Sequence, residues 1–572
     1  MYQKVMTRTN MVTKNIQKLL LVRKYSNLSS QHLWTKENVV NSPYNDIQLP
    51  SLNVTDYIWQ NLDKWADKPA MICGITNRSY TYNELYKYSR ILAVKLRTQW
   101  DIREGDITCI MMPNNPEYAI VTLGSLEAGA AVTTINPLYT VHEVQRQLLL
   151  SNPKIVIGSP ETIGLIKEAC KNTRMNLPII AAKNSNESLP PETISFLELI
   201  DDRNVDFSVL NTVTKNIDDI ALVPYSSGTT GLPKGVELVH RTLVTNFVQQ
   251  DAEGIRHYQH TTDSHQESLL AVLPLYHLYG LAVILLQKLT VGAKIVTLPK
   301  FERKTFLHAV KEHKTSLLHL VPPLASFLGS HPSVEDEYLS HIHTYISGAA
   351  PLPKQDIFRV LEKSKSNVDF LQIYGMTELS PLATTVPPGS KNYTSVGVAL
   401  PSTKLRIVDS DDQNMEPNAV GELLIKGPQI MKGYRNNLEA TKAVITDDGW
   451  FRSGDLASID YDGVVTIRDR IKELIKVKGF QVAPAELESV LKEHPDILDA
   501  AVIGVPDAKL GEVPKAFVVV KDGCKQDSTN VKKFVEDRVA SYKRLSDVEF
   551  MKSLPRNPSG KILRKVLREN YS

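Results

Sequence analysis

The chain has 572 residues, a formal net charge of +3 and four cysteines. A chain of this length rarely has a single hydrophobic core, so we expect two to four domains. The near balance of charge gives no argument for nucleic-acid binding, and the ordinary apolar content argues against intrinsic disorder. The cysteines are scattered without metal-site or disulfide spacing, which favours a reducing compartment.

The N-terminal leader differs in composition from the rest of the chain. No acidic residue precedes Glu37, and Val12, Ile16 and Leu19 lie on one side of a possible helix. A basic, acid-free segment with hydroxyl residues is typical of a mitochondrial transit peptide. We therefore expect residues 1–30 to direct the protein to the mitochondrial matrix. A disordered basic tail is the alternative interpretation, with the cytoplasm or a peroxisome as the alternative location.

Short apolar strands and helices alternate from residue 107 onward, and the same rhythm returns after residue 242. The pattern predicts strands at residues 107–112, 131–135, 154–157, 269–273, 293–298, 316–321 and 342–347, and helices at 117–128 and 140–151. Such alternation predicts parallel sheets covered by helices, with ligands at the carboxyl ends of the strands. The most apolar window, 268–287, contains Pro274, His277 and Gly280, so we expect a strand, a loop and a core helix there and no transmembrane segment.

The C-terminal third changes pattern twice. From Leu405 short strands and turns predict a small antiparallel barrel, and the charged run at residues 468–473 predicts a linker. Beyond it, helices at 484–492 and 531–544 and two intervening strands predict a compact module. The expected fold is therefore α/β. A large N-terminal domain, residues 45–470, joins parallel sheets to the barrel, and residues 471–572 form a small mobile α+β domain.

A glycine-rich stretch follows a predicted buried strand at residues 220–223. Glycines let backbone N–H groups approach an anion, hydroxyls add donors, and a lysine adds a point charge. The candidate phosphate-binding residues are Ser226, Ser227, Gly228, Thr229, Thr230, Gly231 and Lys234. The stretch lacks the spacing and the Gly-Lys-Ser/Thr ending of a Walker loop. A polar surface loop is the alternative interpretation.

Four further polar clusters have chemistry suited to a nucleotide. Residues 374–378 offer an aromatic face for a purine and a carboxylate for Mg²⁺, which prefers oxygen ligands, although Thr377 could simply cap a helix. Asp455 could accept hydrogen bonds from both ribose hydroxyls, or simply occupy a turn. Taken singly, His277 is better interpreted as a satisfied core histidine and Lys561 as an exposed lysine on a turn.

Taken together, these segments closely resemble the adenylate-forming superfamily. They occur in the order found there, at residues 226–236, 374–378, 453–455, 469–470, 475–482 and 559–561. Residues 347–352 and 481–488 look most like the branch of 4-coumarate–CoA ligase and firefly luciferase. The resemblance covers about residues 45–570, and it implies an AMP-forming acyl-CoA synthetase. A carboxylate attacks the α-phosphorus of Mg-ATP to give an acyl-adenylate and diphosphate, and the thiol of coenzyme A then displaces AMP.

The resemblance also implies a set of site residues. The implied catalytic residues are Lys561, His277, Thr377, Glu378 and Lys476, and Glu378 would also hold Mg²⁺. The implied nucleotide- and CoA-binding residues are those of the glycine-rich stretch together with Gly348, Ala349, Ala350, Tyr374, Gly375, Asp455, Arg470, Lys478 and Gly479.

The implied roles divide between the two steps of the reaction. Thr229, Thr230 and Lys234 would hold the β- and γ-phosphates, Thr377 would contact the α-phosphate, and Tyr374 would stack on adenine. Asp455 and Arg470 would bind the ribose, and His277 would lie beside the acyl carboxylate. The C-terminal domain would rotate about a hinge at Lys472. Lys561 would serve adenylate formation, and the segment from Lys476 to Gly479 would serve thioester formation.

The sequence does not determine which carboxylic acid is the acyl substrate. Ile373 stands where relatives usually carry glycine, and Tyr279 could narrow the acyl pocket, so a medium or long fatty acid and an aromatic acid both fit. The leader favours fatty acids. A luciferase-like oxygenase and a catalytically weak acyl- or nucleotide-binding relative are the alternatives. The intact Lys234, Glu378 and Asp455 argue against the second of these.

Overall fold

The structure is a computed structural model. It describes residues 33–182, 189–202, 204–226, 233–364, 367–477, 480–507, 510–524, 527–539, 541–558 and 560–571. The predicted transit peptide, residues 227–232 of the glycine-rich stretch, Lys478, Gly479 and Ser559 lie outside these ranges. Across the ranges that are described, no helix is both long and apolar enough to span a lipid bilayer.

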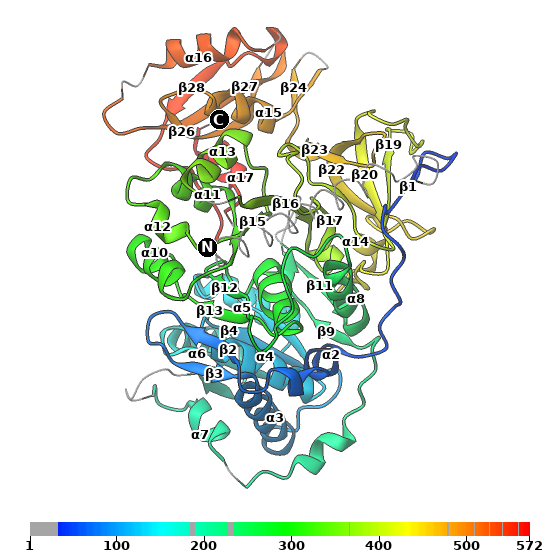
Figure 1. Ribbon diagram of the computed structural model, residues 1–572, viewed down its shortest axis with the longest axis vertical. Helices are drawn as coiled ribbons and strands as arrows, with labels where there is room; N and C mark the ends of the chain where they lie inside the picture. Colours follow the sequence, from blue (N-terminus) through cyan, green and yellow to red (C-terminus); the bar gives the residue numbers. More distant parts are fainter. Residues whose placement is uncertain are drawn as a thin grey trace, which may run out of the picture.

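The first sheet has a parallel centre with antiparallel strands at one edge (Figure 1). Its order is β10-β11-β9-β5-β4-β6-β7-β8, with β10 and β11 antiparallel to their neighbours. The strands are β4 (Ile107–Met111), β5 (Ala131–Thr134), β6 (Ile155–Gly158), β7 (Ile179–Ala181), β8 (Ile194–Ser195), β9 (Ile220–Leu222), β10 (Tyr225–Ser226) and β11 (Lys234–Val239). The helices between them are α4 (Glu117–Glu127), α5 (Val141–Ser151), α6 (Pro160–Thr173) and α7 (Phe196–Ile200). Helix α4 is buried along its whole length, as its apolar sequence predicts.

The second sheet repeats this architecture. Its order is β18-β17-β16-β15-β14-β12-β13-β2-β3, parallel from β16 to β2. The strands are β2 (Pro69–Cys73), β3 (Ser79–Thr81), β12 (Ser268–Ala271), β13 (Lys294–Thr297), β14 (Leu317–Leu320), β15 (Thr344–Ser347), β16 (Asp369–Gly375), β17 (Leu382–Thr385) and β18 (Val398–Ala399). Its helices include α10 (Arg303–Glu312), α11 (Pro322–Ser330), α12 (Asp336–Leu339) and α13 (Lys354–Lys363), whereas α8 (His240–Asp251) contacts β9 and β11 of the first sheet. The predicted α/β class with parallel sheets is confirmed.

Two helix starts show how the sequence sets local structure. Thr81 accepts a hydrogen bond from the Glu84 N–H, and Glu84 accepts one from the Thr81 N–H, so α3 (Tyr82–Gln99) begins with a capping box. Thr140 and Glu143 form the same arrangement at the start of α5. Helix α5 begins where the sequence predicts it.

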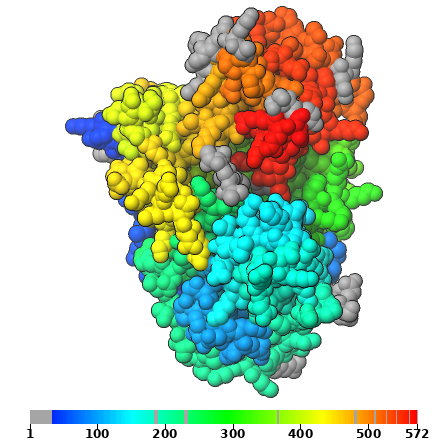
Figure 2. All heavy atoms as spheres, turned by 180° about the vertical axis from the view of Figure 1, so that it is seen from behind, coloured from blue at the N-terminus to red at the C-terminus, as the bar shows by residue number. Residues whose placement is uncertain are grey.

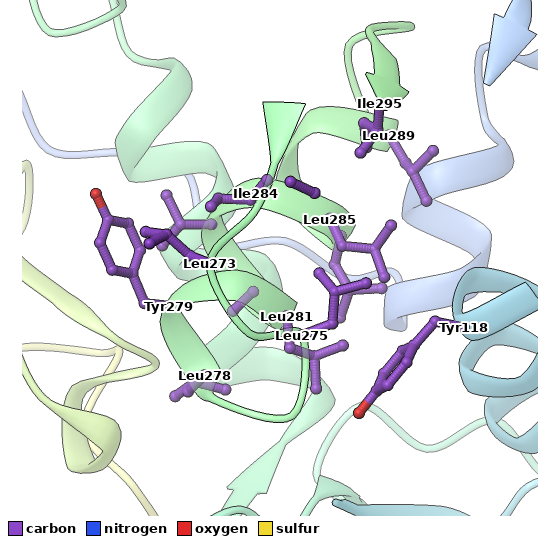
Figure 3. Close-up of a cluster of buried hydrophobic side chains, with 14 of the residues drawn as sticks. Tyr118, Leu273, Leu275, Leu278, Tyr279, Leu281, Ile284, Leu285, Leu289 and Ile295 are labelled. Atoms are coloured by element: carbon purple, nitrogen blue, oxygen red, sulfur yellow. The ribbon is translucent and has the colours of Figure 1, made fainter. Parts of the chain in front are cut away.

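The apolar window at residues 268–287 forms a strand, a turn and a buried helix, as predicted. The helix is wide, with π-type turns over Tyr279–Leu286, and it continues as α9 (Gln287–Leu289). Figure 3 shows Leu281 and Leu285 packed towards Tyr118 of α4, and Tyr279 reaching out on the opposite side. A Cβ on Gly280 would lie 2.1 Å from the Pro274 carbonyl oxygen, so only glycine permits this close approach.

The predicted small barrel is an antiparallel half-barrel of order β1-β19-β20-β22-β23. Its strands are β1 (Val40–Asn41), β19 (Lys404–Val408), β20 (Gly421–Lys426), β22 (Phe451–Ile459) and β23 (Val465–Arg470), with β21 (Gly433–Tyr434) and α14 (Leu438–Lys442) beside it. The charged run at 468–473 is only partly a linker. Its first three residues complete β23, because Arg470 pairs with Asp455 and Asp469 with Leu456, and the turn Ile471–Glu473 makes the connection.

The C-terminal domain has hydrophobic clusters of its own and packs above the carboxyl ends of the second sheet (Figure 1). Its elements are β24 (Ile475–Val477), β25 (Phe480–Val482), α15 (Pro484–Lys492), β26 (Ile497–Asp507), β27 (Gly511–Val520), α16 (Ser528–Glu536), β28 (Asp547–Phe550) and α17 (Arg564–Tyr571). The predicted helix over 531–544 is wrong in its second half. Helix α16 ends at Glu536, because the chain must turn to bury Leu545 and pair β28 with β27.

Candidate active site

Lys561 is the residue of the C-terminal domain that meets the N-terminal domain's polar clusters. Its loop is held rigidly: the Lys561 N–H donates to Asn557 Oδ1 at 2.8 Å, and Arg556 donates to the Gly560 carbonyl at 2.7 Å. A Cβ on Gly560 would lie 3.1 Å from the side chain of Val321, the residue between β14 and α11. The φ angle of Gly560 is +85°, a conformation that favours glycine. The loop therefore packs directly against the N-terminal domain, and Figure 2 shows the C-terminal residues, in red, against it from behind.

The electrostatic surroundings of Lys561 identify its neighbours. Burial and the Arg470 guanidinium lower the pKa of Lys561, while the carboxylates of Asp455 and Glu378 raise it, leaving the pKa at about 8. Arg470, Asp455 and Glu378 belong to three separate sequence motifs, and all three lie close enough to influence the Lys561 amine. The structure brings together the predicted ribose, magnesium and bridging residues.

This pKa predicts the pH dependence of adenylate formation. A lysine pKa lowered from 10.5 to about 8 means that the ammonium is present below pH 8 and is lost above it. We therefore expect kcat/KM for the acid, which reports the free enzyme, to fall as the pH rises through about 8. Diphosphate release measured from pH 6 to 10 checks this. A profile that stays flat to pH 10 would contradict it.

Asp455 is the centre of a buried hydrogen-bonded group. It is 2% exposed, and its two carboxylate oxygens accept from Arg470 Nε at 2.9 Å and from the Tyr374 hydroxyl at 2.7 Å. The register of β22 and β23 places Asp455 directly opposite Arg470. A carboxylate has about four lone-pair positions, so each oxygen can accept one more hydrogen bond. This arrangement suits a pair of vicinal hydroxyls.

Glu378 lies in a second polar group, which the sequence did not reveal. The Tyr434 hydroxyl donates to Glu378 Oε1 at 2.9 Å, and Lys234 Nζ lies 4.8 Å from the centre of the Tyr434 ring. Tyr434 therefore joins the predicted phosphate loop to the predicted magnesium ligand. No sequence motif marks it, because it comes from the short strand β21, which pairs with β11.

His277 precedes the buried helix and is held in one tautomer. Its Nδ1 accepts a hydrogen bond from the Tyr279 N–H at 3.2 Å, so in the neutral ring Nε2 carries the proton. Burial, and to a smaller extent the Lys561 ammonium, lowers the pKa of His277 to about 4. The ring is therefore neutral at pH 7 and can donate from Nε2.

The segment Gly348–Ala350 follows β15 and is conformationally strained. Ala349 adopts φ +71°, a left-handed conformation that costs a non-glycine residue about 1 kcal/mol. A Cβ on Gly348 would lie 2.9 Å from the side chain of Ile373. Isoleucine at position 373, where relatives usually carry glycine, therefore fills space against this segment. A Cβ on Gly375 would lie 2.0 Å from the Pro381 carbonyl oxygen, so glycine is required there as well.

Several predicted residues lie outside the group around Lys561 or outside the described ranges. Ser226 and Lys234 flank the phosphate loop as partners in the β10–β11 hairpin, and the loop residues between them, Ser227, Gly228, Thr229, Thr230 and Gly231, are not described. Thr377 begins the short helical turn Thr377–Leu379 that carries Glu378. Lys476 is exposed on β24, and its neighbours Lys478 and Gly479 are not described. The roles assigned to these residues stay predictions.

A buried ion pair between the domains is a feature that the sequence also did not reveal. Lys492 Nζ at the end of α15 lies 2.5 Å from Asp356 Oδ2 in the first turn of α13, and both side chains are buried. Arg359 lies 3.3 Å from the other oxygen of Asp356. The pair joins residues 136 positions apart, and neither sits in a recognisable motif.

Comparison with known proteins gives a consistent result over nearly the whole chain. The AMP-binding enzyme family matches residues 58–435, and the AMP-binding enzyme C-terminal domain matches residues 486–561. The chain is 41% identical to 4-coumarate–CoA ligase 1 of Solanum tuberosum and 39% identical to that of Arabidopsis thaliana. These matches cover 91% of this chain, and 95% and 93% of the relatives. Among solved structures, ATP-bound MatB from Rhodopseudomonas palustris matches with a TM-score of 0.80 at 28% identity, over 91% of this chain and 98% of that one.

The two domains and the polar residues between them have the arrangement of an adenylate-forming enzyme. The chain belongs to the AMP-binding enzyme family, as an AMP-forming acid–CoA ligase. The predicted resemblance to the 4-coumarate–CoA ligase branch is thereby confirmed.

Proposed function

We propose that the protein joins a carboxylic acid to coenzyme A at the expense of ATP, through an acyl-adenylate. The observation that carries this proposal is the convergence of Lys561, Asp455 and Glu378 with the neutral His277. An attacking carboxylate and the α-phosphate are both anions, and a unit-charge pair 4 Å apart costs about 4 kcal/mol at an effective dielectric near 20. The Lys561 ammonium between them offsets that repulsion as charge develops in the transition state.

The geometry of the N-terminal groups supports one placement of ATP. The ribose hydroxyls would donate hydrogen bonds to Asp455, whose carboxylate is held in place by Arg470 and Tyr374. The phosphates would extend towards Glu378 and Lys234, which meet at Tyr434. The neutral His277 would donate from Nε2 to the acyl carboxylate and hold it beside Lys561.

The residues around Glu378 fit a magnesium ion. Mg²⁺ is usually bound by one or two carboxylates together with substrate phosphates, and no group of three or more metal-binding side chains is found in the described part of the chain. Glu378 is 8% exposed; one of its oxygens accepts from Tyr434, and the other has no hydrogen-bond partner among the described residues. Bound there, Mg²⁺ would neutralise phosphate charge.

This assignment predicts the effect of Glu378→Gln. The substitution keeps the shape and the contact with Tyr434 but removes the negative charge, so we expect the Mg²⁺ concentration for half-maximal adenylate formation to rise about tenfold or more. Diphosphate release is measured across a Mg²⁺ titration. Glu439→Gln, on the exposed face of α14, is the matched control and should leave the titration unchanged. An unchanged curve for Glu378→Gln would exclude this residue as the ligand.

Thioester formation requires a different arrangement of the C-terminal domain. In the structure Lys561 faces the site, whereas Lys476 is exposed on β24. Rotation about the turn Ile471–Glu473 would withdraw Lys561 and bring the Lys476 segment to the adenylate, where it would guide coenzyme A. A short connection between two separately packed cores suits such a motion.

The test of the proposed function is a panel of carboxylic acids. Purified protein is incubated with ATP, Mg²⁺ and coenzyme A and with fatty or aromatic acids, and diphosphate, AMP and the thioester are measured together. We expect AMP and thioester in equal amounts. Oxygen uptake replacing thioester formation would favour a luciferase-like oxygenase, and failure with every acid would favour a non-catalytic relative.

The substrate and the location remain proposals. The two plant relatives are named for 4-coumarate, which is an aromatic acid, whereas the basic leader favours a mitochondrial fatty-acid enzyme. Ile373 and Tyr279 both add bulk near Gly348, which favours a narrow acyl site. Sequencing the N-terminus of the protein from mitochondria tests the import proposal, which requires cleavage within the first thirty or so residues.

A further inference from the structure

Two buried basic side chains and one half-buried histidine lie in the interior of the N-terminal domain, and none of them belongs to the site above. Lys288 lies on α9, His319 on β14, and His257 in the segment before β12. Within the described residues, Lys288 Nζ and His319 Nε2 have no hydrogen-bond partner. Burying polar groups in this way costs free energy unless a partner meets them. We call these three residues the basic cluster.

The members of the basic cluster lie within electrostatic reach of each other. Burial lowers the pKa of all three, and the Lys288 ammonium lowers the pKa values of His257 and His319 further. The pKa of Lys288 falls to about 7. Its Nζ lies 3.6 Å from the centre of the Tyr258 ring, a cation–π contact that offsets part of the cost of burial.

The nearby carboxylates are already engaged by other residues. Asp251 bonds to His260 at 2.7 Å and to the Tyr258 hydroxyl at 3.2 Å. Glu267 bonds to Ser316 and, at 3.1 Å, to His343. Both raise the pKa of Lys288 from a distance, but neither forms an ion pair with it. The cluster therefore lacks a direct anionic partner among the described side chains.

A chain of contacts joins the basic cluster to the reaction centre. Tyr279 follows His277 by two residues, and its hydroxyl lies 3.2 Å from His319 Nδ1 and 3.3 Å from the carbonyl of Ile346, two residues before Gly348. Figure 3 shows Tyr279 extending from the side of the helix opposite Leu285. Lys288 lies on the same helix, eleven residues after His277; an α-helical rise of about 1.5 Å per residue would separate their backbones by roughly 16 Å, and the wider π-type turns between them make this an upper limit.

We propose that the basic cluster binds a second carboxylate at the far end of an extended acyl substrate, so that the enzyme activates α,ω-dicarboxylic acids. The inference rests on the proposed function and specifies its substrate. One carboxylate would lie beside His277 and Lys561, and the chain would pass Tyr279. The other carboxylate would accept a hydrogen bond from Lys288. Its negative charge would also favour protonation of the two histidines, whose ring N–H groups could then donate as well. Hydrogen bonds between charged groups are the stronger kind, and an arriving anion would stabilise the protonated form of Lys288.

The experiment compares acids that differ only at the far end. A homologous series of straight-chain monocarboxylic, ω-hydroxy and α,ω-dicarboxylic acids is assayed by diphosphate release with the full-length protein. For the best chain length we expect kcat/KM to favour the dicarboxylic acid over its monocarboxylic analogue by about tenfold or more. Lys288→Met, which keeps the length and removes the charge, should reverse that preference. His319→Leu should shift the preference in the same direction.

Lys294→Met is the matched control, because this lysine lies on β13 and donates to the His313 carbonyl at 3.0 Å. It should leave the preference unchanged. Melting temperatures of all variants show that they are folded. The proposal is overturned if the wild type prefers the monocarboxylic or ω-hydroxy acid, or if Lys288→Met and His319→Leu leave the ratio unchanged. Those results would mean that the basic cluster has only a structural role, with water as its hydrogen-bond partner, and that the ligase activity does not depend on it. Failure of every acid would instead refute the proposed function.

Discussion

Replacing Lys561 with alanine is expected to abolish adenylate formation while leaving thioester formation from a supplied acyl-adenylate nearly intact. The amine is the positive charge delivered by the C-terminal domain to a site that already contains Asp455 and Glu378. Removing one such stabilising group from a preorganised site costs roughly a hundred- to a thousandfold in rate. Thioester formation would not suffer, because Lys561 would be withdrawn by then. Diphosphate release and thioester yield, measured separately, give the two rates.

The matched control for this experiment is Lys565→Ala. Lys565 lies four positions further along on α17, with a side chain that is 86% exposed and loosely paired with Glu569 at 3.6 Å. Both half-reactions should be unaffected by that substitution. Equal loss of the two half-reactions in Lys561→Ala would contradict the division of labour between the two faces of the domain.

Lys492→Met is expected to slow adenylate formation selectively by weakening the docked arrangement of the domains. In the docked state the substitution leaves the Asp356 carboxylate buried with Arg359 as its remaining charged partner. After the C-terminal domain rotates away, water would solvate this carboxylate. Losing one partner of a buried ion pair costs about 3 kcal/mol, which corresponds to roughly a hundredfold change in the docking equilibrium. The rate of diphosphate release should fall by up to that factor. Thioester formation from a supplied adenylate should be maintained.

The double variant Lys492→Met with Asp356→Leu provides the decisive comparison. Replacing both charges by apolar groups removes the cost of an unpaired carboxylate, so adenylate formation should recover by a large part of the loss. Failure to recover would mean that the pair acts on folding and not on docking. Unfolding midpoints of the three proteins separate the two cases.

The fold was largely predictable because its parallel strands are apolar and short, and its helices carry local signals. The capping pairs Thr81–Glu84 and Thr140–Glu143 are such local signals, and α5 begins where the sequence predicts it. The prediction fails where long-range pairing decides. Helix α16 ends at Glu536 because β28 must reach β27, and the start of the charged run becomes part of β23 because Arg470 pairs with Asp455.

The site was predictable only where its residues lie in motifs. Asp455, Arg470, Tyr374 and Lys561 all belong to segments that the resemblance identifies, and the structure places them around one point. Tyr434 and the Lys492–Asp356 pair lie outside any motif, since their partners are distant in sequence and are set by β-strand and domain packing. The proposed determinants of the acid differ in the same way: Ile373 lies in a recognised segment and stands out as a departure from it, whereas no local pattern marks Lys288.

The backbone at Gly560 and Lys561 is hydrogen-bonded within its own domain, to Arg556 and Asn557. Under the proposed function, the amine reaches the substrates when the whole domain is docked. The observed rate of adenylate formation is then the intrinsic rate multiplied by the fraction of molecules that are docked. If one molecule in ten were docked, the apparent affinity of any ligand that needs this state would be weaker by about tenfold. Ligands and substitutions can thus tune the enzyme through this population without touching a reacting atom.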